Sequence, residues 1–266
     1  MSEKMSFIDA GIKTDSSVYL VECVTPDQNK IFRDTIDKFH SYVKYKDSPT
    51  RNIRWLVYET VTGIQIGAIG LSSATIAVSV RDNYIGWDNE TKMKNLCCLA
   101  NNSRFCLAQP RITIKNAASS TLKQMRLAGA KRWKEKYGDD LILLETFVQP
   151  DRGEEYNNHK LRAGSCYLAD NWIYIGETQG NHIRKTPLGL WAKEKGERGR
   201  LAREDPTECL KRYAGYLGDH NDSGYKVTKV AKKLMLIKPL VKKWKERLTE
   251  KYECGSVETI VGSVCP

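Results

Sequence analysis

The first part of the chain alternates apolar and polar positions in patterns that predict a strand, a helix and a hairpin. Residues 17–26, "SVYLVECVTP", indicate an edge strand that ends at a proline. Residues 27–43 carry apolar side chains at helical spacing, with Asp27 as the expected N-cap. Residues 54–60 and 64–74 are two apolar runs on either side of a glycine turn, which predicts a β-hairpin.

The second part of the chain continues this mixture of strands and helices. Residues 95–107 predict a short helix or turn and then a strand, and residues 119–138 an amphipathic helix closed by glycine. Residues 141–149, "LILLETFVQ", indicate a central strand, and 164–180 a turn, a helix and a strand. Residues 229–252 predict a strand and a basic helix. This order favours an α/β (α+β) fold, with a mixed central sheet flanked by helices, over a helix bundle.

The organisation that follows has three parts. Residues 1–50 supply a strand and a helix packed on the core, 51–183 form the core domain, and 184–266 form a basic, partly flexible extension. A chain of 266 residues with 41% hydrophobic content is long enough to bury a sizeable core. Neither a membrane-spanning run nor a secretory signal is visible, so we expect a cytoplasmic protein with no membrane partner.

Positive charge is concentrated in two runs. The formal net charge is +11, and residues 184–251 contain 19 Lys and Arg against 9 Asp and Glu. Residues 122–137 form a second basic run, and aromatic residues such as Trp133 and Trp244 are interleaved with the charges. The alternative is a solvated helix face, but phosphate contacts combined with stacking platforms favour a nucleic-acid surface. Its candidate residues are Lys123, Arg126, Lys131, Arg132, Lys232, Lys233, Lys242 and Lys243.

Cysteine and histidine spacing argues against disulfides and structural zinc. The eight cysteines include an adjacent pair, Cys97 and Cys98, and the others are scattered through apolar stretches. We therefore expect buried free thiols. The four histidines are isolated, and no CxxC or HxxxH spacing is present.

Three carboxylates are candidates for catalysis. Glu145 lies in an apolar strand, where an acid must be paired, neutralised or functional. If Asp82 and Asp151 met Glu145 at one strand edge, the three could hold Mg²⁺ for phosphodiester cleavage. The alternative is a structural carboxylate that binds neighbouring backbone or Arg104.

A polar group just before a strand is a candidate for contacts with phosphates or bases. Asn101, Asn102 and Arg104 suit such contacts, and equally suit a network that fixes a turn. At the start of the following helix, Ser119 is a candidate cap and phosphate donor.

The stretch "GSCYLADNWIYIGETQG" has both a structural and a catalytic interpretation. A packed joint in the core is one. In the other, Tyr167 near the helix start acts as a nucleophile toward a DNA phosphate or as a proton relay. Cys166 would gain thiolate character at the same helix end, and Asn171 would face the site. We favour a joint that also presents Tyr167 and Asn171 to a site.

A set of motifs resembles a known family. In order they are "IGAIGLSSA", "RDNYIGW", "NNSRFCL", "NAASSTL", "LLETFVQ" and "GSCYLADNWIYIGETQG". Over residues 55–180 they are similar to the domain shared by the DruA component of the Druantia antiphage system and by transposon-associated proteins. The resemblance implies a core similar to that of GNAT-type acyltransferases. It also implies other defence or transposition proteins as partners.

Two functions remain open at this stage. The first is a DNA-engaging protein of phage defence or mobile-element biology that binds single-stranded or distorted DNA, with cleavage or modification as a further step. The second is an N-acyltransferase that uses acyl-coenzyme A. Such enzymes cradle pyrophosphate on a glycine-rich turn before a helix, and "ITIKNAASST" has no glycine. This argues against coenzyme A and leaves Mg²⁺ as the candidate cofactor.

Overall fold

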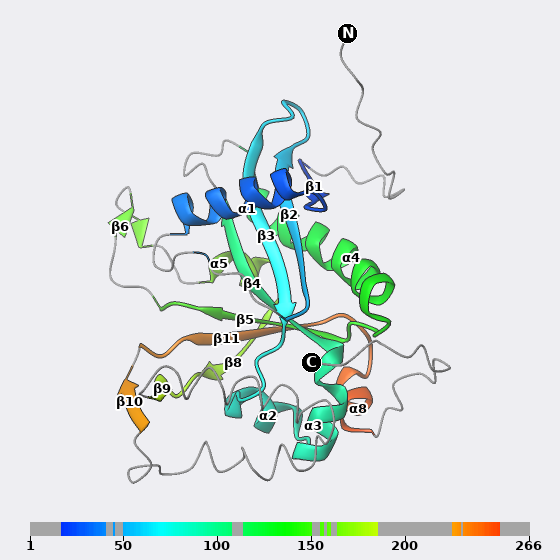
Figure 1. Ribbon diagram of the computed structural model, residues 1–266, viewed down its shortest axis with the longest axis vertical. Coiled ribbons are helices and arrows are strands. Elements are labelled where there is room, and N and C mark those ends of the chain that lie inside the picture. Colours follow the sequence, from blue (N-terminus) through cyan, green and yellow to red (C-terminus); the bar gives the residue numbers. More distant parts are fainter. Residues whose placement is uncertain are drawn as a thin grey trace.

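A seven-stranded sheet with strand order β1-β2-β3-β4-β5-β11-β8 forms the centre of the molecule (Figure 1). The computed structural model describes, with side chains, residues 17–40, 45, 50–107, 114–150, 164–180 and 231–250. It also describes the backbone of four short strands: β6 (Glu155–Tyr156), β7 (His159–Lys160), β9 (Asn181–Lys185) and β10 (Tyr225–Lys229). Neighbouring strands of the sheet are antiparallel except β4 and β5, which run parallel. The predicted mixed sheet is confirmed.

The first elements follow the predicted order, with shifted ends. They are β1 (Val18–Glu22), α1 (Pro26–Phe39), β2 (Asn52–Glu59) and β3 (Gln65–Ser73). The N-cap of α1 is Thr25, and not Asp27 as predicted. Thr25 and Gln28 form a reciprocal capping box, while Asp27 lies in the first turn, where a negative charge suits the helix dipole.

The later elements also match the predicted types, except for two helices at residues 79–85 and 89–95 that were not predicted. They are α2 (Ser79–Ile85), α3 (Asn89–Asn95), η1 (Leu96–Cys98), β4 (Leu99–Leu107), α4 (Ala117–Tyr137), β5 (Leu143–Val148), α5 (Ser165–Ala169), β8 (Ile173–Glu177), β11 (Leu234–Pro239) and α8 (Trp244–Thr249). Helix α4 ends at Gly138, whose left-handed conformation (φ +80°) suits glycine. The segment 184–266, assigned to an extension, supplies β11, which lies between β5 and β8 in the sheet.

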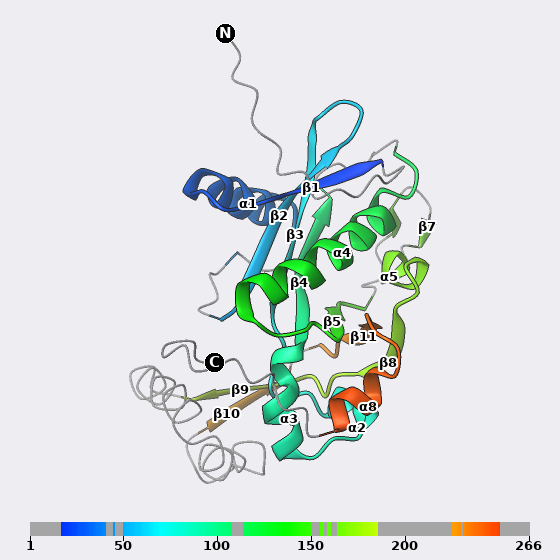
Figure 2. The same cartoon turned by 90° about the vertical axis from the view of Figure 1, so that its right-hand side faces the viewer.

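The two faces of β2–β4 are covered by different helices (Figures 1 and 2). Leu122, Met125 and Trp133 of α4 pack against alternate side chains of β2 and β3 in the largest core cluster. On the opposite face, Phe32 and Ile36 of α1 pack in a smaller cluster with side chains of the same strands. This alternation follows from the two-residue period of a strand.

A third cluster covers β5 and β11. Helices α2, α3 and α8 gather at the end of the molecule below β11 in Figure 1, and α2 and α8 contribute Ile85 and Leu248 to a cluster with Ile142 and Ile237. Asn95 of α3 donates from its side-chain amide to the carbonyls of Leu248 (2.8 Å) and Glu250 (3.1 Å), which ties α8 to α3. In the part of the chain that the structure describes, no helix is both long and apolar enough to cross a bilayer.

A β-bulge interrupts the pairing of β3 with β4. Gly70 lies opposite Arg104, but the next residue of β3, Leu71, lies opposite Asn102, so Ser103 is an extra residue. In a regular strand Asn102 and Arg104 would share a face. The bulge sends Asn102 toward the α4 face and Arg104 toward the α1 face. The backbones of β3 and β4 also approach closely at Gly67, where a Cβ would clash with the Cys106 carbonyl oxygen.

Candidate nucleic-acid-binding site

Glu145 is fully buried, and both of its carboxylate oxygens are occupied. One accepts a hydrogen bond from the backbone N–H of Thr75 at 2.9 Å, and the other from the guanidinium of Arg81 at 2.8 Å. The side chains of Arg81 and Glu145 are both 0% exposed. The predicted alternative, a paired structural carboxylate, therefore describes this geometry, but the partner is Arg81 and not Arg104.

Arg81 extends this pair into a network. Its guanidinium also donates to Asp82 at 2.7 Å and to the carbonyl of Thr75 at 2.7 Å. Asp82 in turn receives the indole N–H of Trp87 at 3.1 Å and the ammonium of Lys92 at 3.2 Å. Glu145 and Asp82 both bind the Arg81 guanidinium, so they form a charge network and not the hypothesised carboxylate cluster. Asp151 lies outside the described residues, and within these no group of three metal-ligating side chains is present.

Tyr167 is a buried joint between β4, β5 and α5. Its hydroxyl donates to the side-chain oxygen of Asn102 at 2.7 Å, and the hydroxyl of Thr146 lies 3.4 Å from the Tyr167 oxygen. The ring packs edge-on against Phe105 and Trp172. β4 and β5 pair only from Leu99 to Asn101, so this joint connects the two strands just beyond the point where their pairing stops.

Asn102 connects the Tyr167 hydroxyl to the bulge. Its side-chain amide donates to the carbonyl oxygens of Gly70 (3.1 Å) and Arg104 (3.3 Å), on the two strands that the bulge separates. A buried amide has both donors and an acceptor to satisfy, and here all are used. The Tyr167 hydroxyl thus fixes the side chain that fixes the bulge, and the bulge directs Arg104 to the α1 face.

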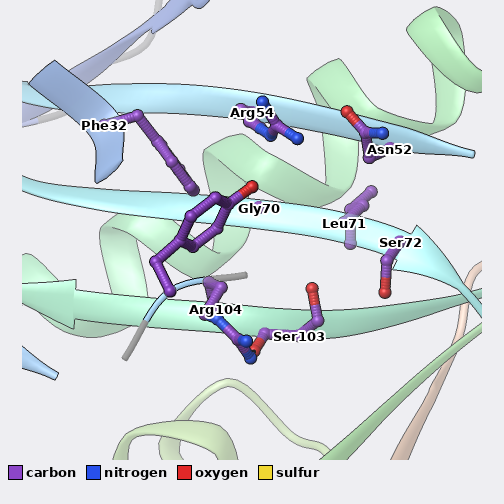
Figure 3. A pocket seen from close by; sticks show the side chains of 9 residues that line it. Phe32, Asn52, Arg54, Gly70, Leu71, Ser72, Ser103 and Arg104 are labelled. Atoms are coloured by element: carbon purple, nitrogen blue, oxygen red, sulfur yellow. The ribbon is translucent and has the colours of Figure 1, made fainter. Parts of the chain in front are cut away.

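A pocket of about 200 Å³ lies on this face, at the point where Arg104 emerges. Figure 3 shows Arg54 of β2 and Arg104 of β4 on either side of Gly70 in β3. Gly70 has no side chain, so it leaves open space between the two arginines. A Cβ at this position would lie 3.3 Å from the ring of Phe32. The other lining residues are Phe32, Tyr45, Asn52, Leu71, Ser72 and Ser103. We call this cavity the arginine pocket.

Aromatic rings and guanidinium groups face one another in the arginine pocket. The guanidinium carbon of Arg54 lies 5.5 Å from the ring centre of Tyr45 and 5.9 Å from that of Phe32. The guanidinium carbon of Arg104 lies 5.8 Å from the ring centre of Tyr45. Planar cations beside aromatic rings are the groups that bind phosphates and stack on bases.

Arg104 has unused hydrogen-bonding capacity. One terminal nitrogen donates to the carbonyl of Ser103 at 2.7 Å, but the buried Nε has no hydrogen-bond partner among the residues described. The side-chain oxygen of Asn101, on the same strand, is likewise buried without a partner in that part of the chain. Buried polar groups are normally satisfied, so an unsatisfied guanidinium N–H in a cavity is a candidate ligand contact.

The neighbourhood of Arg104 is electrostatically positive. Burial lowers the pKa of His40, at the end of α1, below its ordinary value of 6.5, and the positive charges of Arg104 and Lys233 lower it further. Arg104 and Lys233 therefore lie close enough to His40 to disfavour its protonated, positively charged form. An anion bound among these groups would relieve that repulsion.

A second cavity, of about 530 Å³, adjoins the arginine pocket and shares Asn52 and Arg54 with it. Its other lining residues come from β1, from α1 and its N-terminal approach, and from α4: Glu22, Cys23, Val24, Pro26, Asn29, Arg33, Arg132 and Lys136. We call it the edge groove, because β1 is the edge strand of the sheet.

Comparison with known proteins identifies the family. The family model described as "Druantia protein DruA" matches residues 4–192. The chain belongs to the DruA family. No curated protein matches it.

Among solved structures, the chain is similar to one described as "putative acetyltransferase from Sphaerobacter thermophilus DSM 20745". The two are 9% identical, and the match covers 85% of this chain and 96% of that chain with a TM-score of 0.37. This score is too low to carry fold details or function from one chain to the other.

The predicted basic residues of α4 are largely engaged in ion pairs. Arg126 binds Asp170 through two nitrogens, at 2.7 and 2.9 Å. Arg132 lies 2.9 Å from Glu22, Lys131 lies 3.8 Å from Glu135, and Lys123 is exposed. Trp133, expected as an exposed stacking residue, is instead fully buried in the core.

The remaining predicted contacts are spread over the molecule. Lys232, Lys242 and Lys243 are exposed, while Lys233 is half-buried and, like Arg104, lowers the pKa of His40. Asn171 is exposed, in a left-handed conformation (φ +57°), and its carbonyl accepts from Lys238. Ser119 does not cap α4, since Asn116 is the N-cap residue and Ser119 donates to its carbonyl at 3.1 Å.

The described cysteines are free thiols, as expected, but Cys166 does not have the lowered pKa that its place at a helix start predicted. Burial raises the pKa of Cys166 to about 11, so its helix end does not produce the expected thiolate. The five cysteines within the described ranges are free thiols, as predicted.

Sequence reasoning missed Arg54, Arg81 and Tyr45. The alternation in "NIRWLVYE" did carry a signal for Arg54, since Ile53, Trp55 and Val57 belong to one face and Arg54 must then face the other. For Arg81 the signal was Glu145 itself, because a buried carboxylate requires a cation.

The Glu145 network generates a prediction about stability. Glu145→Gln should lower the free energy of unfolding by about 3 kcal/mol, the lower end of the cost of breaking a buried ion pair, because Asp82 still neutralises Arg81. Urea unfolding followed by circular dichroism measures this. Glu90→Gln, in the exposed pair with Lys94, is the control and should change stability by less than about 0.5 kcal/mol. Equal effects of the two substitutions would contradict the network's structural role.

Tyr167 generates a second prediction. Tyr167→Phe keeps the packed ring but leaves the Asn102 oxygen without its donor, which should cost about 1–3 kcal/mol. Thermal and urea unfolding measure the loss, and Tyr174→Phe, at a half-exposed tyrosine of β8, should be neutral. If Tyr167→Phe is as stable as the parent but inactive in DNA processing, Tyr167 is a reactive group and not a joint.

Proposed function

We propose that this protein binds DNA through the arginine pocket, as a component of phage defence or mobile-element biology. The observation that carries the proposal is the placement of Arg54 and Arg104 beside the half-buried ring of Tyr45, with the buried Nε of Arg104 unsatisfied among the described residues. Guanidinium groups satisfy phosphate oxygens, and aromatic rings stack on bases. Membership of the DruA family supports the biological setting.

Charge supports the same proposal. The chain carries a formal net charge of +11, and Lys233 and Arg104 together repel the protonated form of His40. Such a surface attracts polyanions, and its affinity for them falls as the salt concentration rises. Cleavage or modification of the DNA would need reactive groups beyond those of the arginine pocket, so binding is the activity proposed.

Arg104 provides the direct test. Arg104→Gln should weaken binding of a fluorescein-labelled oligonucleotide about tenfold at moderate salt and lower the slope of log affinity against log salt by about 1, because one phosphate contact is lost. Fluorescence anisotropy across a salt series measures both. Lys94→Gln, which removes one exposed charge on α3, is the matched control and should match the parent. If Arg104→Gln binds as tightly as the parent, the arginine pocket does not bind DNA.

His40 provides a test of ligand position. A phosphate bound near Arg104 and Lys233 should raise the pKa of His40 from its lowered value, so DNA affinity should rise as pH falls through the window between the free and bound pKa values. Histidine ring proton NMR, with and without oligonucleotide, measures the shift, and His40→Gln assigns the signal. If the pKa of His40 is unchanged in protein saturated with oligonucleotide, the phosphate is bound away from His40.

A further inference from the structure

We infer that the nucleic acid is single-stranded, and that it places one unstacked base in the arginine pocket while its backbone continues through the edge groove to the C-terminal end of α4. This rests on the proposed function and extends it to the form of the ligand and its route. The two cavities meet at Asn52 and Arg54, which line both, so a chain of linked nucleotides can occupy them together.

The contents of the arginine pocket favour a single strand. The half-buried ring of Tyr45 lines the pocket beside the guanidinium groups, and the buried ring of Phe32 lies beneath it, next to Gly70. A ring face is available to a base only if that base has left its own stack. Bases in a duplex are stacked on their neighbours, whereas those of a single strand can turn outward without breaking base pairs.

The contents of the edge groove favour the backbone. Arg33 of α1 and Arg132 and Lys136 of α4 contribute cations to its lining, and Glu22 is the one acid among the described residues that line it. Glu22 lies 2.9 Å from Arg132, so these two charges balance, and the excess positive charge comes from the other cations. Burial raises the pKa of the lining thiol of Cys23 to about 12, so the groove presents no thiolate at neutral pH. A groove with excess positive charge and, in the part of its lining that the structure describes, no aromatic ring suits phosphates better than bases.

The two cavities also have the positions that a continuous route requires. The arginine pocket lies on the sheet face covered by α1, whereas α4 covers the other face (Figures 1 and 2). The edge groove is lined from both helices and from the end of β1, so it connects the two faces around the edge of the sheet. Asn52 is fixed at the junction, since its backbone N–H donates to the Tyr137 hydroxyl at 2.8 Å.

The test separates the pocket from the groove by ligand length. Fluorescence anisotropy compares a 12-nucleotide oligo-dT, a dinucleotide, and a duplex of the same length. The single strand should bind at least about tenfold more tightly than the duplex. Lys136→Gln should weaken binding of the 12-mer about threefold to tenfold and leave dinucleotide affinity unchanged, whereas Arg104→Gln should weaken both. Lys94→Gln is the control for loss of one exposed lysine.

The outcomes distinguish this inference from the proposed function. If the duplex binds as tightly as the single strand, or if Lys136→Gln matches the parent with every ligand while Arg104→Gln does not, the route is wrong and the arginine pocket stands. If Arg104→Gln has no effect, or no oligonucleotide binds, the proposed function fails as well. The matching oligo-U series identifies the sugar, and tight binding of either single strand supports the inference. Circular dichroism melting confirms that both variants are folded.

Discussion

The buried ion pair between Arg81 and Glu145 is the interaction on which the lower half of the molecule depends. Glu145 lies on β5, in the centre of the sheet, and its partner Arg81 comes from α2 and also binds the carbonyl of Thr75. In the segment after β3, Thr75 and Ile76 are exposed, and Ala74 and Val78 on either side of them are buried in the third core cluster. Taking both charges out of water is costly, and neither is tolerated without the other. The network therefore specifies where α2 lies and, through Asp82 and Lys92, where α3 begins.

A second chain of contacts links the core to the arginine pocket. The Tyr167 hydroxyl orients Asn102, the Asn102 amide bridges the carbonyls of Gly70 and Arg104, and the bulge turns Arg104 toward Arg54. Structural and functional interpretations of Tyr167 are therefore less separate than the sequence suggests. A phenol that touches no ligand can still determine where a guanidinium lies.

Most strands and helices could be predicted because apolar spacing dominates local structure, as in "LILLETFVQ" and in the helix that ends at Gly138. The candidate site could be predicted only in part. Arg104 was found from its polar neighbours, but Asn102 was grouped with it, because strand periodicity places them on one face and one inserted residue separates them. Partners distant in sequence, such as Arg81 and Glu145, carry no local pattern. An acyltransferase-like core remains an expectation from the resemblance.

The bulge at Ser103 makes the pairing of β4 as important as its composition. Every side chain after Ser103 owes its face to the bulging of this one residue out of the ladder. Regular pairing of the same residues, without the bulge, would exchange the two faces of the strand from Arg104 onward, so that a guanidinium would enter the apolar layer under α4 while Phe105 turned away from it. The pairing at a single residue therefore decides whether each face of this strand carries a cation or an apolar side chain.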